Sequence, residues 1–92
     1  MITGTITPHQ NYKYLEIVTT WYDAQGNVIP CEIIPIAWNV NDPKANQPIR
    51  FSTIPAFMNT TVKPVKVDLK VCNYPFSNGD ERFTIYETTL NL

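Results

Sequence analysis

The sequence predicts an all-β protein, an antiparallel sandwich of two sheets made from six or seven short strands. Three observations lead to this class. Apolar and polar residues alternate with a period of two in several segments, no segment shows helical apolar spacing, and eight prolines are spread along the chain. Turn signals recur about every 8 to 12 residues, a spacing typical of β-sandwiches.

The N-terminal third predicts a short strand and then a hairpin. Residues 2–7 alternate apolar and polar side chains and end at Pro8, which removes a backbone donor. Two apolar runs within residues 15–29 flank the polar turn 23–27, where Gly26 supplies the positive φ that a short bulged connection requires. We therefore expect the chain to reverse direction there.

Side-chain alternation assigns two faces to the first hairpin strand. One face carries Leu15, Ile17, Thr19 and Trp21, and the other carries Glu16, Val18, Thr20 and Tyr22. Because both faces hold apolar residues, we expect one to be covered fully and the other in part. Trp21, Phe51 and Phe83 are the aromatic residues that we expect in the core.

Two prolines interrupt the next apolar segment, residues 28–38. Backbone N–H groups alternate sides along a strand, so Pro30 and Pro35 remove one donor on each edge. We expect a bulge, or a crossing from one sheet to the other, near Pro35. Residues 39–47 follow as a predicted polar loop.

The second half predicts two further strands and a final one. Residues 48–54 form a short strand built on Ile49 and Phe51, and residues 55–61 form a loop. In residues 62–71 the alternation is cleanest, with Val65, Val67, Leu69 and Val71 facing inward and Lys66, Asp68 and Lys70 facing water. A turn region, 73–80, leads to a last strand, 81–92, that we expect to pair with the hairpin or with 62–71.

Size and charge bound the organisation and the partners. Ninety-two residues make a single domain, 1–92, and its strand-like ends suggest a domain excised from a larger protein. Seven basic against eight acidic residues give no basic face, so nucleic acid is not an expected partner. No apolar run approaches the ~18 residues of a membrane helix, so we expect membrane attachment only through segments outside this chain.

No catalytic constellation is evident, and we predict no enzyme activity and no cofactor. The chain has one histidine, His9, and two serines, Ser52 and Ser77, without a pattern that pairs them. The carboxylates, Glu16 among them, lie in predicted turns or at outward positions, so we expect them on the solvated surface.

A metal site is not predicted either. Asn39, Asn41 and Asp42 are oxygen donors, but Lys44 and Arg50 stand where a calcium loop needs glycine and a bidentate glutamate.

Cys31 and Cys72 leave two alternatives open. A disulfide between them would close a loop of about 40 residues and stabilise the fold by roughly 3 to 4 kcal/mol. Free buried thiols are the alternative, since cysteine packs as a small apolar side chain. A bridge would indicate an oxidising compartment.

Aromatic side chains are the candidate binding residues. Tyr22 must face away from its buried neighbour Trp21, and we select Tyr22, Trp38 and Tyr74 as members of a possible exposed platform.

The hairpin resembles the FxLYD domain, a small immunoglobulin-like sandwich of bacterial and archaeal envelope proteins. The resemblance rests on Gly4 in the first strand and on Tyr22, Asp23, Gly26, Val28 and Ile29 around the turn. Thr19 and Trp21 depart from the phenylalanine and leucine usual in that family. The resemblance implies an immunoglobulin-like fold and an extracytoplasmic, non-catalytic interaction or spacer module of an envelope protein, with a protein partner. The alternative function is a carbohydrate-binding accessory domain that stacks exposed aromatics on a glycan.

Overall fold

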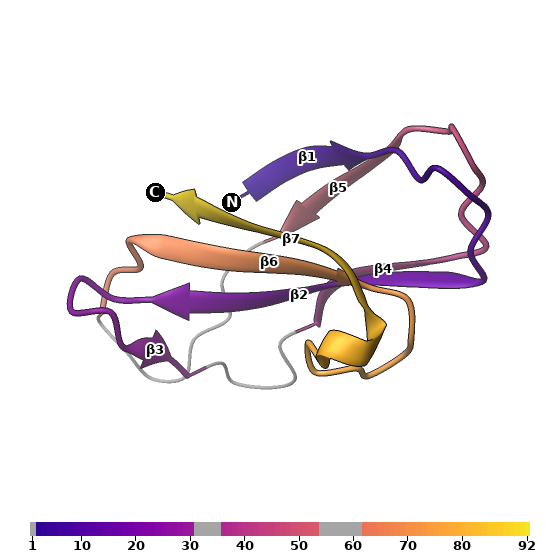
Figure 1. Ribbon diagram of the computed structural model, residues 1–92. Helices are drawn as coiled ribbons and strands as arrows, with labels where there is room; N and C mark the ends of the chain where they lie inside the picture. The colour runs from indigo at the N-terminus through magenta and orange to yellow at the C-terminus, as the bar shows by residue number, and fades with distance from the viewer. Residues whose placement is uncertain (1, 31–35, 54–61) are drawn as a thin grey trace.

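The computed structural model describes residues 2–30, 36–53 and 62–92 (Figure 1). These residues form seven strands, one short 3₁₀ turn and no α-helix. The elements are β1 (Ile2–Ile6), β2 (Tyr14–Tyr22), β3 (Val28–Ile29), β4 (Ile36–Asn41), β5 (Ile49–Thr53), β6 (Lys66–Cys72), η1 (Glu81–Phe83) and β7 (Thr84–Asn91). The predicted all-β class is confirmed.

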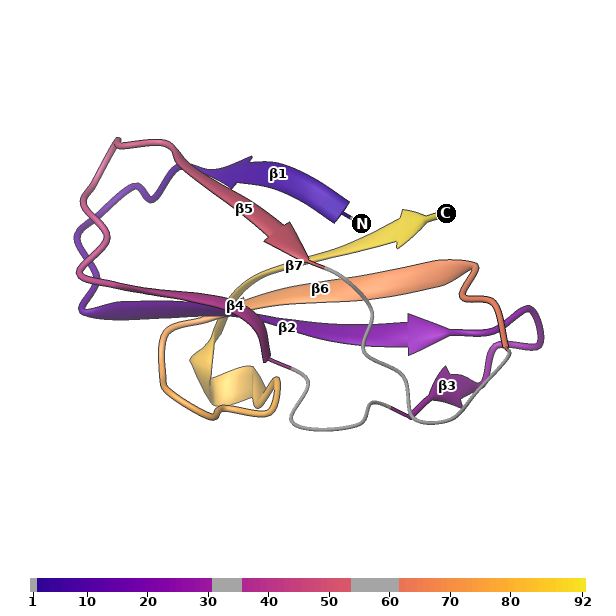
Figure 2. The ribbon, with the colours of Figure 1, turned by 180° about the vertical axis from the view of Figure 1, so that it is seen from behind.

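The strands form two antiparallel sheets. β1 pairs with β5, and the larger sheet has the order β3-β2-β6-β7, with β4 also pairing with β2. The β1–β5 pair lies to one side of the larger sheet, and the two chain ends lie close together in both views (Figures 1 and 2). The predicted antiparallel two-sheet sandwich is therefore confirmed.

The core lies on one face of β2 and β6, which we call the inner face. Its buried side chains are Leu15, Ile17, Trp21, Ile29, Val67, Leu69 and Val71, and half-buried residues of β1, β4 and β5 pack against them. The predicted core position of Trp21 is confirmed, at 3% exposure. Phe51 packs against this core from β5, opposite Gly4 of β1. A Cβ at Gly4 would lie 2.7 Å from Phe51 Cζ, so the ring occupies the space that any other residue would need.

The hairpin turn forms as the sequence predicts. Gly26 has φ +82°, and its N–H donates to the Asp23 carbonyl at 3.1 Å. The Asp23 carboxylate accepts from the backbone N–H groups of Gln25 and Asn27, both at 2.9 Å. Asp23 therefore satisfies the turn's own donors, which is the reason that aspartate favours such positions.

Pro35 lies outside the described residues, but the strands on either side of residues 31–35 belong to one sheet. β3 and β4 both pair with β2, so the expected alternative of a crossing to the other sheet is wrong. The alternative of a bulge is confirmed, because the register shifts where Trp38 pairs with Ile17 and Ile36 pairs with Val18. β4 also continues to Asn41, so the predicted loop 39–47 begins later than expected. The predicted loop 55–61 lies outside the described residues.

Two boundaries in the C-terminal half differ from the prediction. β6 begins at Lys66, and Val65 is 39% exposed, so Val65 does not face the core. Pro64, which directly precedes Val65, has a fixed φ and no N–H and therefore does not continue the strand. Residues 81–83 form η1 instead of the start of the last strand, because the Asp80 carboxylate accepts from Arg82 N and caps a 3₁₀ turn. β7 then pairs with β6, as predicted.

Candidate functional site

Glu16 is buried on the outer face of β2, with no exposed surface, so its predicted position at the solvated surface is wrong. Its carboxylate accepts four hydrogen bonds. Tyr14 Oη donates at 2.8 Å and Phe76 N at 3.0 Å to Oε1. Ser77 donates to Oε2 from N at 3.2 Å and from Oγ at 2.7 Å. A buried charge is tolerated when its lone pairs are filled in this way.

These bonds attach the loop after β6 to the outer face of the larger sheet. The Gly79 carbonyl accepts from Lys70 Nζ at 3.3 Å, and a Cβ at Gly79 would lie 3.7 Å from Val18 Cγ1. The loop therefore covers the outer face of β2, where Val18 is only 3% exposed. Partial covering of this second face is what the apolar alternation of β2 predicts.

The loop after β6, residues 73–83, displays aromatic rings to solvent. We call it the aromatic loop. Tyr74 is 55% exposed and Phe76 is 66% exposed. Tyr74 stacks on Phe83, with ring centroids 4.6 Å apart and an interplanar angle of 18°. Phe83 is thus half-buried beneath Tyr74 rather than in the main core, where the sequence places it.

Phe76 has a left-handed backbone, with φ +56°. For a bulky residue this conformation costs roughly 1 to 2 kcal/mol relative to the usual right-handed region. The bond from Phe76 N to the Glu16 carboxylate holds the backbone in place. Strain of this kind persists only where the surrounding structure maintains it, and it is most common at recognition and active sites.

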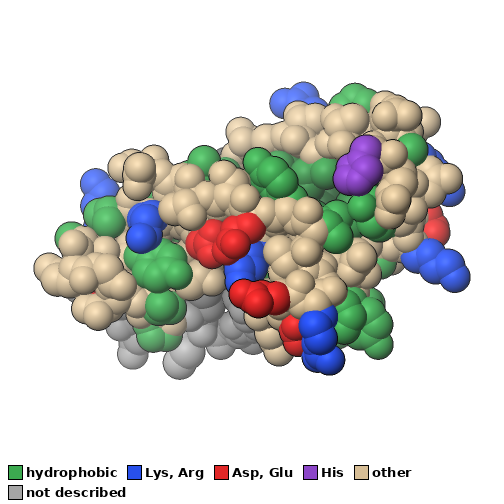
Figure 3. Space-filling model, viewed as in Figure 1, with side chains coloured by type: hydrophobic (Ala, Val, Ile, Leu, Met, Phe, Trp, Pro, Cys, Tyr) green, Lys and Arg blue, Asp and Glu red, His purple; other side chains and the backbone are tan. Residues whose placement is uncertain are grey.

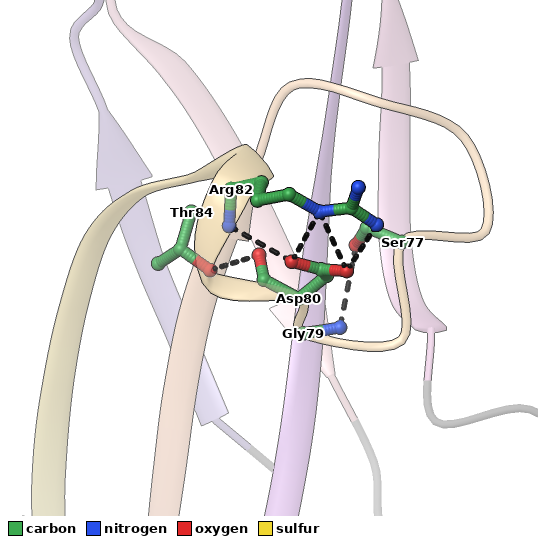
Figure 4. Close-up of polar contacts among 5 residues, drawn as sticks. All are labelled: Ser77, Gly79, Asp80, Arg82 and Thr84. Carbon is green, nitrogen blue, oxygen red and sulfur yellow. Dashed lines mark hydrogen bonds and ion pairs between the residues drawn. The ribbon is translucent and has the colours of Figure 1, made fainter.

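Asp80 and Arg82 form a charged fork beside the Phe83 ring, whose centroid lies 5.3 Å from Arg82 Cζ. Arg82 Nη2 donates to Asp80 Oδ2 at 2.8 Å, and Arg82 Nε lies 3.2 Å from both carboxylate oxygens (Figure 4). The hydrogen bond from the guanidinium lowers the pKa of the Asp80 carboxyl below its ordinary value. Thr84 Oγ1 donates to the Asp80 carbonyl at 2.9 Å, and Gly79 N donates to Ser77 Oγ at 3.3 Å. These bonds fix the part of the loop between Ser77 and Thr84.

Tyr14 extends the polar network at the buried end. Burial and the hydrogen bond to the Glu16 carboxylate raise the pKa of the Tyr14 phenol. Its O–H therefore remains a donor throughout the physiological range, which is what the buried carboxylate requires.

The three aromatic residues selected from the sequence lie in three different environments. Tyr74 is exposed on the aromatic loop. Tyr22 is half-buried at the end of β2, with Lys66 Nζ 4.6 Å from its ring centroid. Trp38 is half-buried against the core, with its ring 6.1 Å from that of Phe51. The described contacts therefore join Tyr74 to Phe83 rather than to Tyr22 or Trp38.

The sequence reasoning missed Glu16 and Phe76. A glutamate between Leu15 and Ile17, inside an apolar run, is a signal that could have indicated burial. No signal in the sequence distinguishes Phe76 from a core aromatic, because its exposure depends on how the loop folds back.

The residues considered for catalysis and metal binding are spread out. His9 and Ser52 are exposed, and the Ser77 hydroxyl is bonded to Glu16. Asn39 and Asn41 belong to the strand β4, whereas Asp42 lies in the turn that follows it, with φ +54°. The described ranges contain no group of three or more His, Cys, Asp or Glu side chains arranged to hold a metal ion.

Cys72 is a buried free thiol, with its Sγ 3.5 Å from Thr84 Oγ1. Cys31 lies outside the described residues, so pairing of the two under oxidising conditions stays a prediction.

Acidic and basic side chains lie next to one another across the middle of the face shown in Figure 3, with hydrophobic side chains to either side of them. An ion pair joins Lys70 Nζ to Glu87 Oε2 at 3.8 Å. Within the described ranges, no helix has the length and apolar character needed to cross a bilayer.

No family model, no curated protein and no solved structure matches this chain.

Proposed function

We propose that this chain is a non-catalytic recognition module, an immunoglobulin-like sandwich that binds a protein partner through the aromatic loop. The setting that we propose is an extracytoplasmic envelope protein, as the likeness of its hairpin to the FxLYD domain implies. The observation that carries the proposal is the exposed ring of Phe76, held on a left-handed backbone by the buried carboxylate of Glu16.

The energetics support a recognition role for this ring. A ring that remains 66% exposed gains little from the hydrophobic effect in the isolated chain. Its backbone conformation also costs free energy that asparagine or glycine would not incur. Burial of such a ring in a partner's apolar pocket would recover about 1.5 to 3 kcal/mol, a typical contribution of an aromatic residue at the centre of an interface.

The test compares Phe76→Gly with a matched control, Val28→Thr. Val28 is a second exposed apolar residue, 58% exposed, on the short strand β3. The free energy of unfolding of Phe76→Gly should be no more than about 1 kcal/mol below that of the wild type. Relief of strain at this position offsets the flexibility of glycine. Immobilised wild type and Val28→Thr should capture the same protein from envelope extract, and Phe76→Gly should not. Equal capture by the wild type and both variants would disprove the role of the loop.

A carbohydrate ligand is the second candidate, and the stacked pair of Tyr74 and Phe83 favours it. Sugar-binding modules present flat aromatic surfaces, and Phe83 fixes the plane of the exposed Tyr74 ring. A glycan array separates the two candidates. Binding that Tyr74→Ala abolishes and Phe76→Gly retains would support the carbohydrate function, and an array without signal would remove it.

The proposed compartment has an independent test. The mass of the intact chain, measured with and without reductant, reports whether Cys31 and Cys72 pair when the protein matures in its own cell. A loss of two hydrogens that reductant reverses would support an oxidising compartment.

A further inference from the structure

β7 forms an edge of the larger sheet and has little of the protection that edge strands commonly have. Among the described residues it pairs with β6 alone. Natural edges are often blocked by lysine, proline or a bulge. β7 contains neither lysine nor proline, and its single charge is Glu87. Its one irregularity lies near its start, where Tyr86 pairs with Val71 and Thr84 pairs with Cys72.

The register of β7 fixes which backbone groups face the open edge. Leu92 N donates to the Val65 carbonyl at 2.9 Å, in register with the pair Lys66 and Asn91. Hydrogen-bonding direction alternates along an antiparallel strand. The N–H and C=O groups of Tyr86, Thr88 and Leu90 therefore point to β6. Those of Glu87, Thr89 and Asn91 point away from it, toward the open edge.

The inner face of β7 carries exposed apolar side chains. Tyr86 and Leu90 pair with Val71 and Val67, which places all four on the inner face. Yet Tyr86 is 61% exposed and Leu90 is 37% exposed. A groove of about 220 Å³ separates them from β1, and its lining includes Ile2, Ile6 and Leu69. The β1–β5 sheet therefore leaves the β7 side of the inner face open.

We propose that β7 pairs antiparallel with β7 of a second copy of this chain, about a twofold axis at Thr88. The outward-facing groups of both strands must meet, which requires the axis to pass at a residue and not between two residues. In this register Glu87 lies opposite Thr89 of the second copy. Tyr86 lies opposite Leu90 of the second copy, so the two exposed apolar side chains cover each other.

Neighbouring registers fit less well. An axis at Glu87 would set two carboxylates directly opposite, an arrangement that destabilises a sheet. An axis at Thr89 would extend the pairing past the end of β7 and would set Leu90 opposite Thr88. Of these three registers, the one with its axis at Thr88 keeps the carboxylates apart and pairs Tyr86 with Leu90 within β7. The two larger sheets then join into one continuous sheet, with the β1–β5 pairs on the same side.

The first measurement is the mass of the full chain by sedimentation equilibrium, at concentrations up to about 1 mM. We expect a monomer–dimer equilibrium. Thr89→Pro removes an N–H that points away from β6, so the bonds between β6 and β7 remain. By symmetry two intermolecular hydrogen bonds are lost, and the dimer dissociation constant should rise about thirtyfold. A chain that remains monomeric, or a dimer that Thr89→Pro does not weaken, would overturn the proposal.

Disulfide trapping tests the register independently of proline. Facing residues of a non-hydrogen-bonded pair have Cα atoms about 4.5 Å apart, within the range of a disulfide. Thr88→Cys should therefore form a covalent dimer on mild oxidation, above the level of the parent chain with its own cysteines. Thr89→Cys is the matched control, because its copies would lie about 8 Å apart and beyond bridging distance. Equal trapping at both positions, or stronger trapping at Thr89, would refute the register.

Discussion

Substitution of Glu16 by glutamine tests the anchor of the aromatic loop. The glutamine amide keeps one acceptor oxygen, but its NH₂ group replaces the oxygen that accepts from Ser77 N at 3.2 Å and from Ser77 Oγ at 2.7 Å. The serine hydroxyl can rotate and accept, whereas the Ser77 N–H becomes a buried donor without a partner. Loss of bonds to a charged acceptor, with one unsatisfied group, costs about 2 to 3 kcal/mol.

The assay is urea unfolding followed by circular dichroism. In thermal unfolding of a domain of this size, the same loss of 2 kcal/mol would lower the melting temperature by about 8 to 16 °C. Glu16→Ala should cost more, about 3 to 5 kcal/mol, because it leaves every donor unpaired and opens a cavity. Gln25→Glu, on the exposed hairpin turn, is a control that we expect to stay within about 0.5 kcal/mol of the wild type.

A double-mutant cycle isolates the central bond. Ser77→Ala alone should cost about 1 to 2 kcal/mol, and the double variant Glu16→Gln with Ser77→Ala should cost less than the sum of the two. If Glu16→Gln unfolds at the same urea concentration as the wild type, the carboxylate does not hold the loop. The explanation of the strained Phe76 backbone would then fail with it.

Three further substitutions have defined outcomes. Gly4→Ala should cost about 1 to 3 kcal/mol in urea unfolding, because the new Cβ meets the Phe51 ring, and Phe51→Leu in the same chain should recover part of the loss. Gly26→Ala should cost about 1 kcal/mol through its φ of +82° alone, since nothing lies within 4 Å of the new Cβ; a neutral result would mean that the turn changes conformation. For Glu87, the hydrogen bond with the Asp68 carboxyl raises the pKa above its ordinary value of 4.5. A carboxyl whose pKa is raised in the folded state stabilises the fold at low pH, and this stabilisation is lost as the pH rises through the folded-state pKa. Glu87→Gln should therefore become more stable relative to the wild type as the pH increases from 4.5, and a difference that does not vary with pH would contradict this account.

Local patterns in the sequence predicted the parts of the fold that depend on local physics. The period-two alternation of residues 15–22 and 62–71 and the glycine turn at Gly26 predict strands and a reversal without reference to the rest of the chain, and β2, β6 and the turn form there. The pairing of β7 with β6 is one of the two predicted possibilities.

The candidate site was less predictable because it depends on contacts between distant segments. Glu16 and Ser77 are separated by 61 positions, so only the folded loop shows that the carboxylate is buried. Tyr74 was selected from the sequence, and it is exposed. Phe76 was not selected for binding, because its left-handed backbone is imposed by the loop and not by its own side chain.

The attachment of the aromatic loop to Glu16 has a consequence for the kinetics of association. Phe76 and Ser77 are ordered during folding, so a partner would meet a preorganised surface and would not have to select one loop conformation among many. Weakening the anchor would then slow productive encounters even though every contacting side chain remained in the chain. A residue with no exposed surface would in this way control how fast the surface is recognised.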